Sequence, residues 1–406
     1  MMTGMSVHAV REPMRRAFGH AAARRSIAEG VIVTVGWGTE IGAGECVPRA
    51  YVTGESVASC VSTLTQTNPA DSTREVSRAS FTDAVRTLEA CELPARLPRL
   101  EAAIPLAAAC AFELALLDAI GRHFRVPLSE LASALELPTS MRQAKGAQFP
   151  ISRVYDATQS LDDFMAGGGA FHHVKVKLGL EPSRDVARLA ELRTAVGGSV
   201  PISVDVNMGW TLEMALEMTR DLERFDIAWY EEPLPRRAWS AYAELRRRRD
   251  VRIMLDESLC SRQDALDAIE AGACQLFNIR ISKCGGLIPS LRLAQLAHRR
   301  GLEFQLGVQV GEMGPLLWAG RQFMSAVRGA VAYEAGQADR FFAEALVEPP
   351  PTVDRLSYLA TASAAAGLGA TVRNEVLARI AISTTTWSAD SRSWLTTRTP
   401  EPCHEA

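Results

Sequence analysis

The chain has 406 residues, of which 47% are hydrophobic and 22% are charged, a composition that suits a globular protein with a sizeable core. Its 44 basic and 47 acidic residues give a formal net charge of −3, which argues against a nucleic-acid-binding protein because such proteins need an excess of positive charge. No apolar run is long enough to cross a bilayer, no secretion signal stands at the start, and the eight cysteines form no CxxC pair. We therefore expect a cytoplasmic protein with free thiols that binds no membrane.

Residues 1–140 are predicted to form an α+β unit. An alternating, β-rich run covers Ile32 to Val35, and the glycine-rich stretch from Gly36 to Glu45 indicates a hairpin turn. Apolar residues recur at four-residue spacing between Ala109 and His123, which predicts a helix that ends before Pro127.

Residues 141–345 show a different pattern, in which short β-branched runs alternate with longer amphipathic stretches. The candidate strands are Phe149–Val154, His173–Lys177, Ile202–Val206, Ile227–Tyr230, Arg252–Leu255, Leu276–Ile281, Glu303–Leu306 and Val331–Tyr333. The candidate helices are Pro182–Ala195, Thr211–Arg224, Ala238–Arg249, Arg262–Ala271 and Leu287–Arg300. Eight strands with intervening helices predict an α/β protein of the TIM-barrel type rather than an open doubly wound sheet, and no GxGxxG motif follows the first strand.

The barrel pattern ends near residue 345. We expect residues 346–382 to return and pack on the first unit. The tail, residues 383–406, is rich in serine, threonine and arginine, and we expect it to be mostly disordered.

Lysine is rare in this chain. Of the 44 basic residues, 40 are arginine and only Lys145, Lys175, Lys177 and Lys283 are lysine. A lysine can release its proton in a protein, whereas an arginine cannot, so a retained lysine is a candidate acid or base.

Polar residues stand in register at the ends of five consecutive candidate strands: Lys175 and Lys177, then Asp205, Glu231, Asp256 and Lys283. The intervals from Lys177 to Lys283 are 28, 26, 25 and 27 residues, and each interval is one βα unit. Catalytic side chains of a barrel project from the carboxyl ends of its strands, and both lysines of a Lys-x-Lys pair share one face. We therefore expect these side chains to meet at the barrel mouth.

Carboxylates on three adjacent strands would repel one another unless a cation lay between them. An all-oxygen site favours Mg²⁺, with Mn²⁺ as an alternative. A substrate carboxylate bound at this metal would hold its α-carbon between the lysines, and the metal would stabilise the enediolate formed when the α-proton leaves. One lysine would remove that proton, and the other would reprotonate the opposite face or help to expel a leaving group.

The motifs KVK, DVN, YEEP, DES and KCGG, in this order, resemble those of the enolase superfamily and, within it, of the muconate-lactonizing subgroup. This subgroup includes muconate cycloisomerases, o-succinylbenzoate synthases, N-acylamino acid racemases and dipeptide epimerases. The resemblance covers about residues 1–380 and includes the predicted helix FELALLDAIGRHFRVPL. It implies an N-terminal α+β capping domain, completed by the return segment, over a (β/α)₇β barrel.

The resemblance also assigns roles to the residues at the strand ends. It implies that Asp205, Glu231 and Asp256 hold Mg²⁺, and that Lys177 and Lys283 are the two acid/base groups. Lys175 would favour the neutral form of Lys177 by its like charge and help to hold the substrate carboxylate. Five further residues are candidates for contacts with these groups or with the substrate: Asn207, Glu257, Glu312, Arg49 and Tyr51.

Racemisation or epimerisation of an amino acid derivative is the leading functional hypothesis. Cycloisomerisation and syn-dehydration are alternatives because the same lysines and metal serve all three, and a catalytically inactive barrel is a third. The Asp-x-Asp pair with which many dipeptide epimerases hold a substrate ammonium is absent after the last strand, which argues against a plain dipeptide. We expect a small-molecule carboxylate substrate and assembly as a homodimer or octamer.

Overall fold

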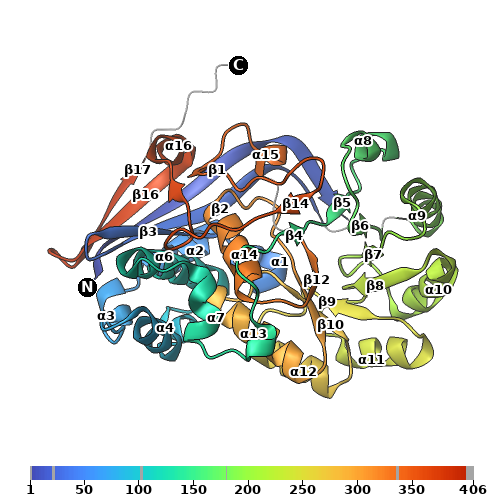
Figure 1. Ribbon diagram of the computed structural model, residues 1–406, viewed down its shortest axis with the longest axis horizontal. Helices are drawn as coiled ribbons and strands as arrows, with labels where there is room; N and C mark the ends of the chain where they lie inside the picture. The colour runs from blue at the N-terminus through green and yellow to red at the C-terminus, as the bar shows by residue number, and fades with distance from the viewer. Residues whose placement is uncertain (1, 21–22, 101–103, 180, 335–337, 399–406) are drawn as a thin grey trace.

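The computed structural model describes residues 2–20, 23–100, 104–179, 181–334 and 338–398 (Figure 1). An antiparallel sheet at one end lies against a parallel barrel at the other. The antiparallel sheet has the order β17-β16-β1-β2-β3. Its strands are β1 (Met2–His20), β2 (Ala23–Trp37), β3 (Glu40–Cys46), β16 (Ala381–Ser388) and β17 (Ser393–Arg398). Its helices are α1 (Ala50–Thr53), α2 (Val57–Thr65), α3 (Pro69–Thr73), α4 (Phe81–Ala90), α5 (Leu93–Arg96), α6 (Leu106–Phe124) and α7 (Leu131–Ala134).

The second sheet is parallel, eight-stranded and in sequence order from β5 to β12. Its strands are β5 (Arg153–Tyr155), β6 (Val174–Lys177), β7 (Ile202–Asp205), β8 (Ile227–Glu231), β9 (Ile253–Leu255), β10 (Leu276–Ile279), β11 (Glu303–Leu306) and β12 (Ala330–Tyr333). A parallel bridge between Ile151 and Tyr333 joins the two ends of the sheet, so that it closes on itself. In this order β6 and β10 are four strands apart and therefore lie on opposite sides of the barrel.

Helices follow the barrel strands and cover the outside of the sheet. They are α8 (Leu161–Ala166), α9 (Pro182–Val196), α10 (Leu212–Leu222), α11 (Trp239–Arg248), α12 (Arg262–Glu270), α13 (Leu287–Arg299), α14 (Pro315–Ala326) and α15 (Ala338–Phe341). The remaining elements are β4 (Phe149–Pro150), β13 (Val347–Glu348), β14 (Leu359–Ala360), β15 (Thr371–Val372), α16 (Asn374–Ile380) and single 3₁₀ turns at Leu128–Glu130, Thr139–Met141 and Glu223–Phe225. The predicted fold class, a TIM-type barrel with an N-terminal α+β unit, is confirmed. The domain boundaries at residues 140, 345 and 382 stay predictions.

Two elements differ from the sequence-based expectation for clear reasons. Helix α14 was not predicted because 11 of its 12 residues are buried, all except Ser325, so it lacks the polar face that makes a helix recognisable. The stretch from Gly36 to Glu45 is mostly strand, since the turn occupies only Gly38 and Thr39. A side chain at Gly42 or Gly44 would collide with the backbone of α6, so these glycines allow close packing rather than a turn.

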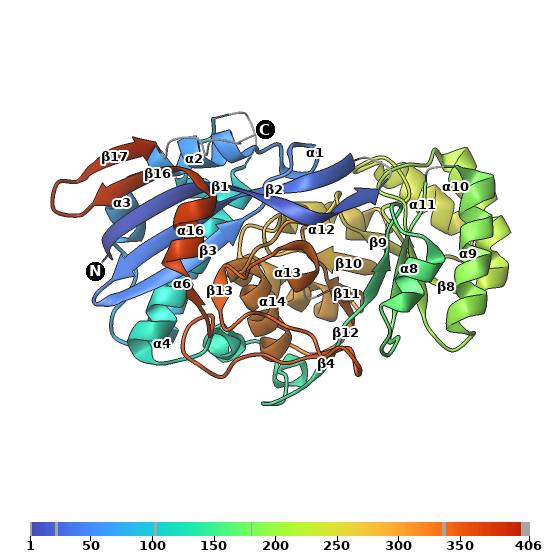
Figure 2. The same cartoon turned by 90° about the horizontal axis from the view of Figure 1, so that it is seen from above.

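The expected disorder of the tail, residues 383–406, is wrong for its described part. β16 pairs with β1, and β17 pairs with β16, at the edge of the antiparallel sheet (Figure 2). The segment from Ala381 to Ser388 is rich in β-branched residues, and its Trp387 is buried in the core. Trp394 of β17 donates a hydrogen bond to the Thr67 carbonyl at 3.1 Å. Residues 399–406 lie outside the described part of the chain.

Buried carboxylates fasten the antiparallel unit to the barrel. Glu45, on β3, accepts hydrogen bonds from the backbone nitrogens of Met313, Gly314 and Leu316, where α14 begins. Glu113, on α6, accepts from the nitrogens of Leu287 and Ile288, the first residues of α13, at 2.5 and 3.3 Å. Each carboxylate thus satisfies free N–H groups at the start of a barrel helix and fixes the cap above the carboxyl ends of the strands.

We expect the Glu113→Gln change to flatten the dependence of stability on pH. Burial raises the pKa of Glu113 to about 8, although its bonds to Leu287 and Ile288 oppose the shift. As the pH rises from about 4.5 to 8, the unfolded chain releases this proton and the folded chain keeps it. The free energy of unfolding therefore falls, by about 1.4 kcal/mol per pH unit for one group. Glutamine has no such proton to release, so this loss disappears.

Urea unfolding at pH 5 and pH 8 measures the effect. The difference in unfolding free energy between the two pH values should be smaller in Glu113→Gln than in the wild type. Glu217→Gln, at an exposed position on α10, is the matched control and should leave the difference unchanged. An unaltered difference in the Glu113 variant would contradict the assignment of this pH dependence to the buried carboxylate.

Candidate active site

The barrel strands gather charged side chains at their carboxyl ends, where the cap covers the barrel. Lys175 and Lys177 stand on β6, Asp205 ends β7, Glu231 ends β8, and Asp256 directly follows β9. Lys177 is the register partner of Asp205, and Asp205 is the partner of Glu231. All are buried, and Lys177 is the most exposed of them at 6%. The structure therefore brings together these five residues predicted from the sequence.

Ion pairs connect the two lysines to these carboxylates. Lys177 Nζ lies 2.5 Å from Asp205 Oδ2 and donates to Asn207 Oδ1 at 3.0 Å. Lys175 Nζ lies 2.6 Å from Glu231 Oε2 and 3.7 Å from Asp205 Oδ2. It also pairs with Glu334, which directly follows β12. The lysines thus neutralise part of the negative charge at the mouth.

The same contacts shift the pKa values of the buried groups. Burial alone would lower the pKa of Lys175, but Glu231, Glu334 and Asp205 outweigh it and raise that pKa above its ordinary value. Burial would raise the pKa of Asp205, but Lys177 and Lys175 lower it below the ordinary carboxyl range. Burial and the neighbouring charge of Asp205 raise the pKa of Glu231 well above the ordinary value, against the effect of Lys175. Such opposed shifts in one cluster are typical of functional sites.

Asn207 and Glu257, two of the candidates from the sequence, lie next to the cluster. Asn207 Nδ2 donates to Glu257 Oε1 at 3.0 Å, and its backbone nitrogen donates to Asp205 Oδ1 at 3.1 Å. Burial, followed by the charges of Asp256 and Glu232, raises the pKa of Glu257 to about 8. Asn207 thus links Lys177 to Glu257 along the mouth.

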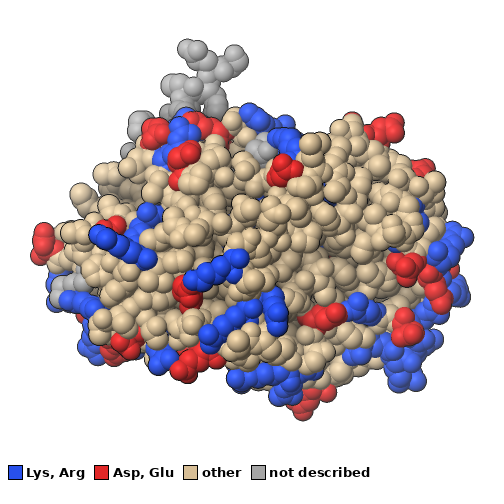
Figure 3. Space-filling view, viewed as in Figure 1, with Lys and Arg blue, Asp and Glu red and all other residues tan. Residues whose placement is uncertain are grey.

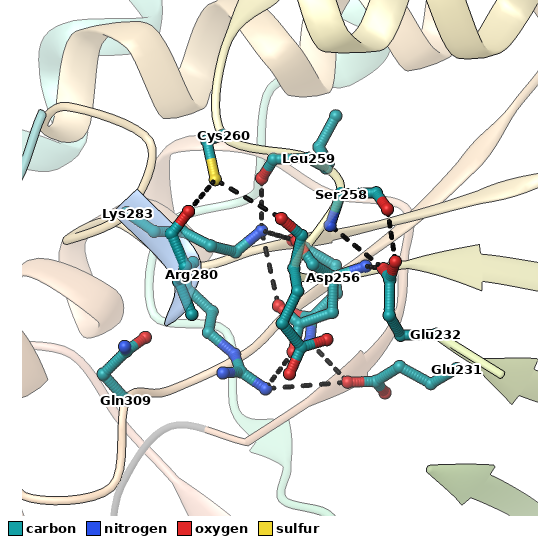
Figure 4. Close-up of polar contacts among 12 residues, drawn as sticks. Glu231, Glu232, Asp256, Ser258, Leu259, Cys260, Arg280, Lys283 and Gln309 are labelled. Carbon is teal, nitrogen blue, oxygen red and sulfur yellow. Dashed lines mark hydrogen bonds and ion pairs between the residues drawn. The ribbon is translucent and has the colours of Figure 1, made fainter. Parts of the chain in front are cut away.

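Glu232 points away from the mouth and supports the loop after β9. It accepts hydrogen bonds from the backbone nitrogens of Asp256 and Ser258 at 2.6 and 3.2 Å (Figure 4). It also accepts one from the Tyr242 hydroxyl at 2.9 Å. Of the two glutamates in the EEP motif, Glu231 therefore faces the cluster and Glu232 holds Asp256 in position.

Lys283 contacts the cluster, with its Nζ 3.4 Å from Asp256 Oδ1, but it does not line the mouth. β10 ends at Ile279, and the following turn buries the Lys283 ammonium among the carbonyls of Asp256, Leu259 and Asn278. Arg280, the first residue after β10, lines the mouth instead. Its guanidinium pairs with Asp256 and lies 3.7 Å from Glu231 Oε1 (Figure 4).

A pocket lies between the cap and the barrel. Cap residues supply one side of it and the strand ends supply the other. Its lining includes Lys175, Lys177, Asn207, Glu257, Arg280, Glu312 and Glu334 from the barrel and Phe18, Arg25, Arg49 and Tyr51 from the cap. Arg49 is held in place by bonds to the carbonyls of Pro48 and Val310 at 2.9 and 2.5 Å. The predicted contacts Arg49, Tyr51 and Glu312 thus all face the pocket.

Sequence reasoning missed Arg280 and Glu334. Each directly follows the last residue of a barrel strand, so the rule that found Asp256 applies to both of them. The sequence predicts a sixth strand that continues to Ile281, which places Arg280 inside the strand and not at its end. Glu334 follows the last strand, where only the absent Asp-x-Asp pair was considered.

The donor chemistry of the cluster fits a hard divalent cation. Within the described residues no three acidic, histidine or cysteine side chains already converge on one point, since lysine and arginine groups pair with the carboxylates. Asp205, Glu231 and Asp256 are nevertheless fully buried carboxylates at adjacent strand ends, and the oxygens of Asp256 are contacted by ion pairs with Arg280 and Lys283 but accept no hydrogen bond. An all-oxygen set of this kind suits Mg²⁺.

The molecular surface offers no broad single-sign patch on the face that Figure 3 shows, where acidic and basic side chains are interspersed around a largely uncharged centre. The run from Arg246 to Arg249, which could suggest an anion site, lies at the end of α11. Two of its members pair with Glu244 and one pairs with Glu223. None of the described helices is long and apolar enough to cross a membrane.

Comparison with known proteins identifies the family and fold to which this chain is similar. Residues 156–376 match the family model of the enolase C-terminal domain-like proteins. The chain is 31% identical to the D-Ala-D/L-Ala epimerase of Cytophaga hutchinsonii over 48% of this chain and 52% of the relative, so that match spans about half of either protein. It is 32% identical to the L-Lys-D/L-Arg epimerase of Methylococcus capsulatus over 66% of this chain and 70% of the relative. The structure of the N-succinyl Arg/Lys racemase from Bacillus cereus has the same fold, with a TM-score of 0.80 over 95% of this chain and 99% of that chain at 24% identity.

Proposed function

Because the chain belongs to the enolase C-terminal domain-like family and is an isomerase of the enolase superfamily, in its muconate-lactonizing subgroup, we propose that it acts on a small-molecule carboxylate. The reaction begins when Lys177 removes the proton from the carbon next to the substrate carboxylate. The observation that carries this proposal is the position of Lys177 on the pocket wall, bonded to Asp205 and Asn207 at the end of β6.

Each group in the pocket has a part in this step. Asp205, Glu231 and Asp256 would hold Mg²⁺, which when bound supplies positive charge that stabilises the negative charge developing on the substrate. Lys175 adds a fixed positive charge beside the substrate carboxylate. The cap residues close the pocket above the strand ends and reduce the access of water, which strengthens these electrostatic interactions.

Racemisation or epimerisation of an amino acid derivative is the first candidate for the complete reaction, supported by relatives that are epimerases of dipeptides. Cycloisomerisation is the second, and a specific observation favours it. This reaction needs proton transfer on one face of the substrate, and only the β6 wall of the described pocket carries lysines. Assembly as a dimer or octamer and a cytoplasmic location stay predictions.

We expect proton exchange at the α-carbon to depend on Mg²⁺. The enzyme is incubated in D₂O with N-succinyl-arginine, Lys-Arg dipeptides and a wider panel of carboxylates, with Mg²⁺ or with EDTA. With Mg²⁺, at least one substrate should gain deuterium at the α-carbon, as measured by NMR, and EDTA should suppress this gain about 100-fold or more. The absence of exchange across the panel, or exchange that EDTA leaves unchanged, would contradict the proposed function.

A further inference from the structure

A second lysine opposite Lys177 is required if two amines are to serve the two faces of a substrate. Lys283 cannot fill that place in this structure. Its ammonium has three hydrogens, and it donates to three carbonyls, of Asp256 at 2.7 Å, Leu259 at 2.5 Å and Asn278 at 2.9 Å. The side chain is 1% exposed and does not line the pocket. Lys283 therefore ties β9 and β10 together and does not reach the substrate.

Arg280 occupies the wall that the second lysine was expected to occupy. It follows β10, which lies across the barrel from β6, and its guanidinium lines the same pocket as Lys177. Figure 4 shows this guanidinium extended toward Glu231, whereas the Lys283 ammonium turns toward the Leu259 carbonyl. Its side chain is 10% exposed and lines the pocket, so part of the guanidinium is open to a substrate.

An arginine at this position changes the chemistry of the opposite face. A guanidinium stays protonated in proteins, so it cannot accept the α-proton. For the same reason it cannot deliver a proton to the substrate as a lysine ammonium would. It presents a planar set of N–H donors, which matches a carboxylate or another substrate oxygen. The wall at β10 is thus built to bind an oxygen atom and not to transfer a proton.

We propose that Arg280 is a substrate-binding residue opposite Lys177 and that proton transfer at the α-carbon takes place only on the Lys177 face. This inference rests on the proposed removal of the α-proton by Lys177 and, of the two candidate reactions, it selects cycloisomerisation over racemisation or epimerisation. The proton passes from the α-carbon to Lys177 Nζ while the electron pair of the C–H bond stays on the substrate. Return of the proton from the same amine restores the starting configuration, so isomerisation by this enzyme does not invert the α-carbon.

Deuterium exchange with single enantiomers tests the proposal. N-succinyl-L-arginine, N-succinyl-D-arginine, L-Lys-L-Arg and L-Lys-D-Arg are incubated separately with enzyme and Mg²⁺ in D₂O, and both α-deuterium and configuration are measured. The wild type should exchange one member of a pair with retention, at a rate at least tenfold above that of inversion. Arg280→Lys, which places an amine on the opposite wall, should raise the rate of inversion at least tenfold. Comparable exchange of both enantiomers by the wild type, with inversion, would overturn the proposal.

Arg292→Lys is the matched control, since it makes the same change in a half-buried arginine of α13 that pairs with Glu89 outside the pocket. It should leave exchange and configuration as in the wild type. If Arg280→Lys fails to fold by circular dichroism, Arg280→Gln replaces it. That variant should weaken substrate binding, measured as a raised KM, without creating inversion, and inversion by it would contradict the proposal.

A second measurement needs no substrate. The chain has four lysines, so reductive methylation with formaldehyde followed by peptide mapping reports on each of them. Lys145, whose side chain is 93% exposed, should react first and Lys177 next, while Lys283 stays unmodified in the folded enzyme. Arg280→Lys should add a newly reactive amine. Equal labelling of Lys283 and Lys177 would overturn the proposal. The exchange experiment is independent of this result, because a lack of exchange with every probe contradicts the proposed function instead.

Discussion

Replacement of Lys177 by methionine is expected to lower turnover by about three orders of magnitude and to leave the fold intact. Methionine preserves most of the side-chain volume, but it can neither accept nor return a proton, and a positioned general base contributes about 10²–10⁴-fold to a rate. The change also removes the ion pair with Asp205 at 2.5 Å. The measurement is kcat with a substrate identified by deuterium exchange, together with the melting temperature.

Two further measurements make this prediction specific. Lys145→Met changes an exposed lysine that pairs with Glu130 at 2.9 Å, and it should retain full activity. Magnesium binding by the Lys177 variant, measured by calorimetry, should remain at least as tight as in the wild type because a positive charge next to the carboxylates has been removed. Turnover within tenfold of the wild type would show that Lys177 is not the base.

The contrast between Lys283 and Arg280 shows the limit of arguments from spacing. An interval of about 27 residues identifies the βα unit but leaves an uncertainty of a few residues within it. The sixth strand was expected to reach Ile281, whereas β10 ends at Ile279, and this difference decides which side chain stands at the strand end. The turn after β10 places the Lys283 ammonium among backbone carbonyls and not in the pocket. The hydrophobic pattern of the sequence does not predict the direction of that turn.

The parts predicted well share a physical origin. Lys177, Asp205 and Glu231 each end a strand whose hydrophobic run stops abruptly, so their positions follow from the local pattern. The strands β16 and β17 could not be predicted in this way, because β16 is stabilised by pairing with β1, more than 370 residues away in the sequence. Its many threonines look polar and disordered in isolation, yet they favour a strand once a sheet edge is present.

The pocket combines elements from distant parts of the chain. Phe18, Arg49 and Tyr51 come from the cap, and Arg49 contacts the loop after β11 through the Val310 carbonyl. Such contacts depend on how the cap sits on the barrel, which Glu45 and Glu113 fix by their bonds to α14 and α13. Residues that contact the substrate from the cap therefore carry little signal in the sequence, whereas those on the strands carry much.

The Asp205→Asn change is expected to weaken Mg²⁺ binding by about 100-fold or more and to lower turnover at least as much. Changes to residues that only support a metal ligand typically cost 10–100-fold in affinity, and loss of the charge of a ligand itself should exceed this. Asp205 also contacts both lysines, so its amide replacement weakens the positioning of Lys177 as well. Calorimetry measures the affinity without any substrate.

A thermal shift gives the same information independently. Saturation of the wild type with Mg²⁺ at 100 times its dissociation constant should stabilise the fold by about 2.7 kcal/mol, and the variant should lose most of this gain at the same Mg²⁺ concentration. Asp221→Asn, which changes an exposed aspartate on α10 that lies 3.4 Å from Arg220, should behave as the wild type does. If Asp205→Asn bound Mg²⁺ as tightly as the wild type, the metal would lie elsewhere. The charged cluster at the barrel mouth would then be held together by its lysines and Arg280 alone.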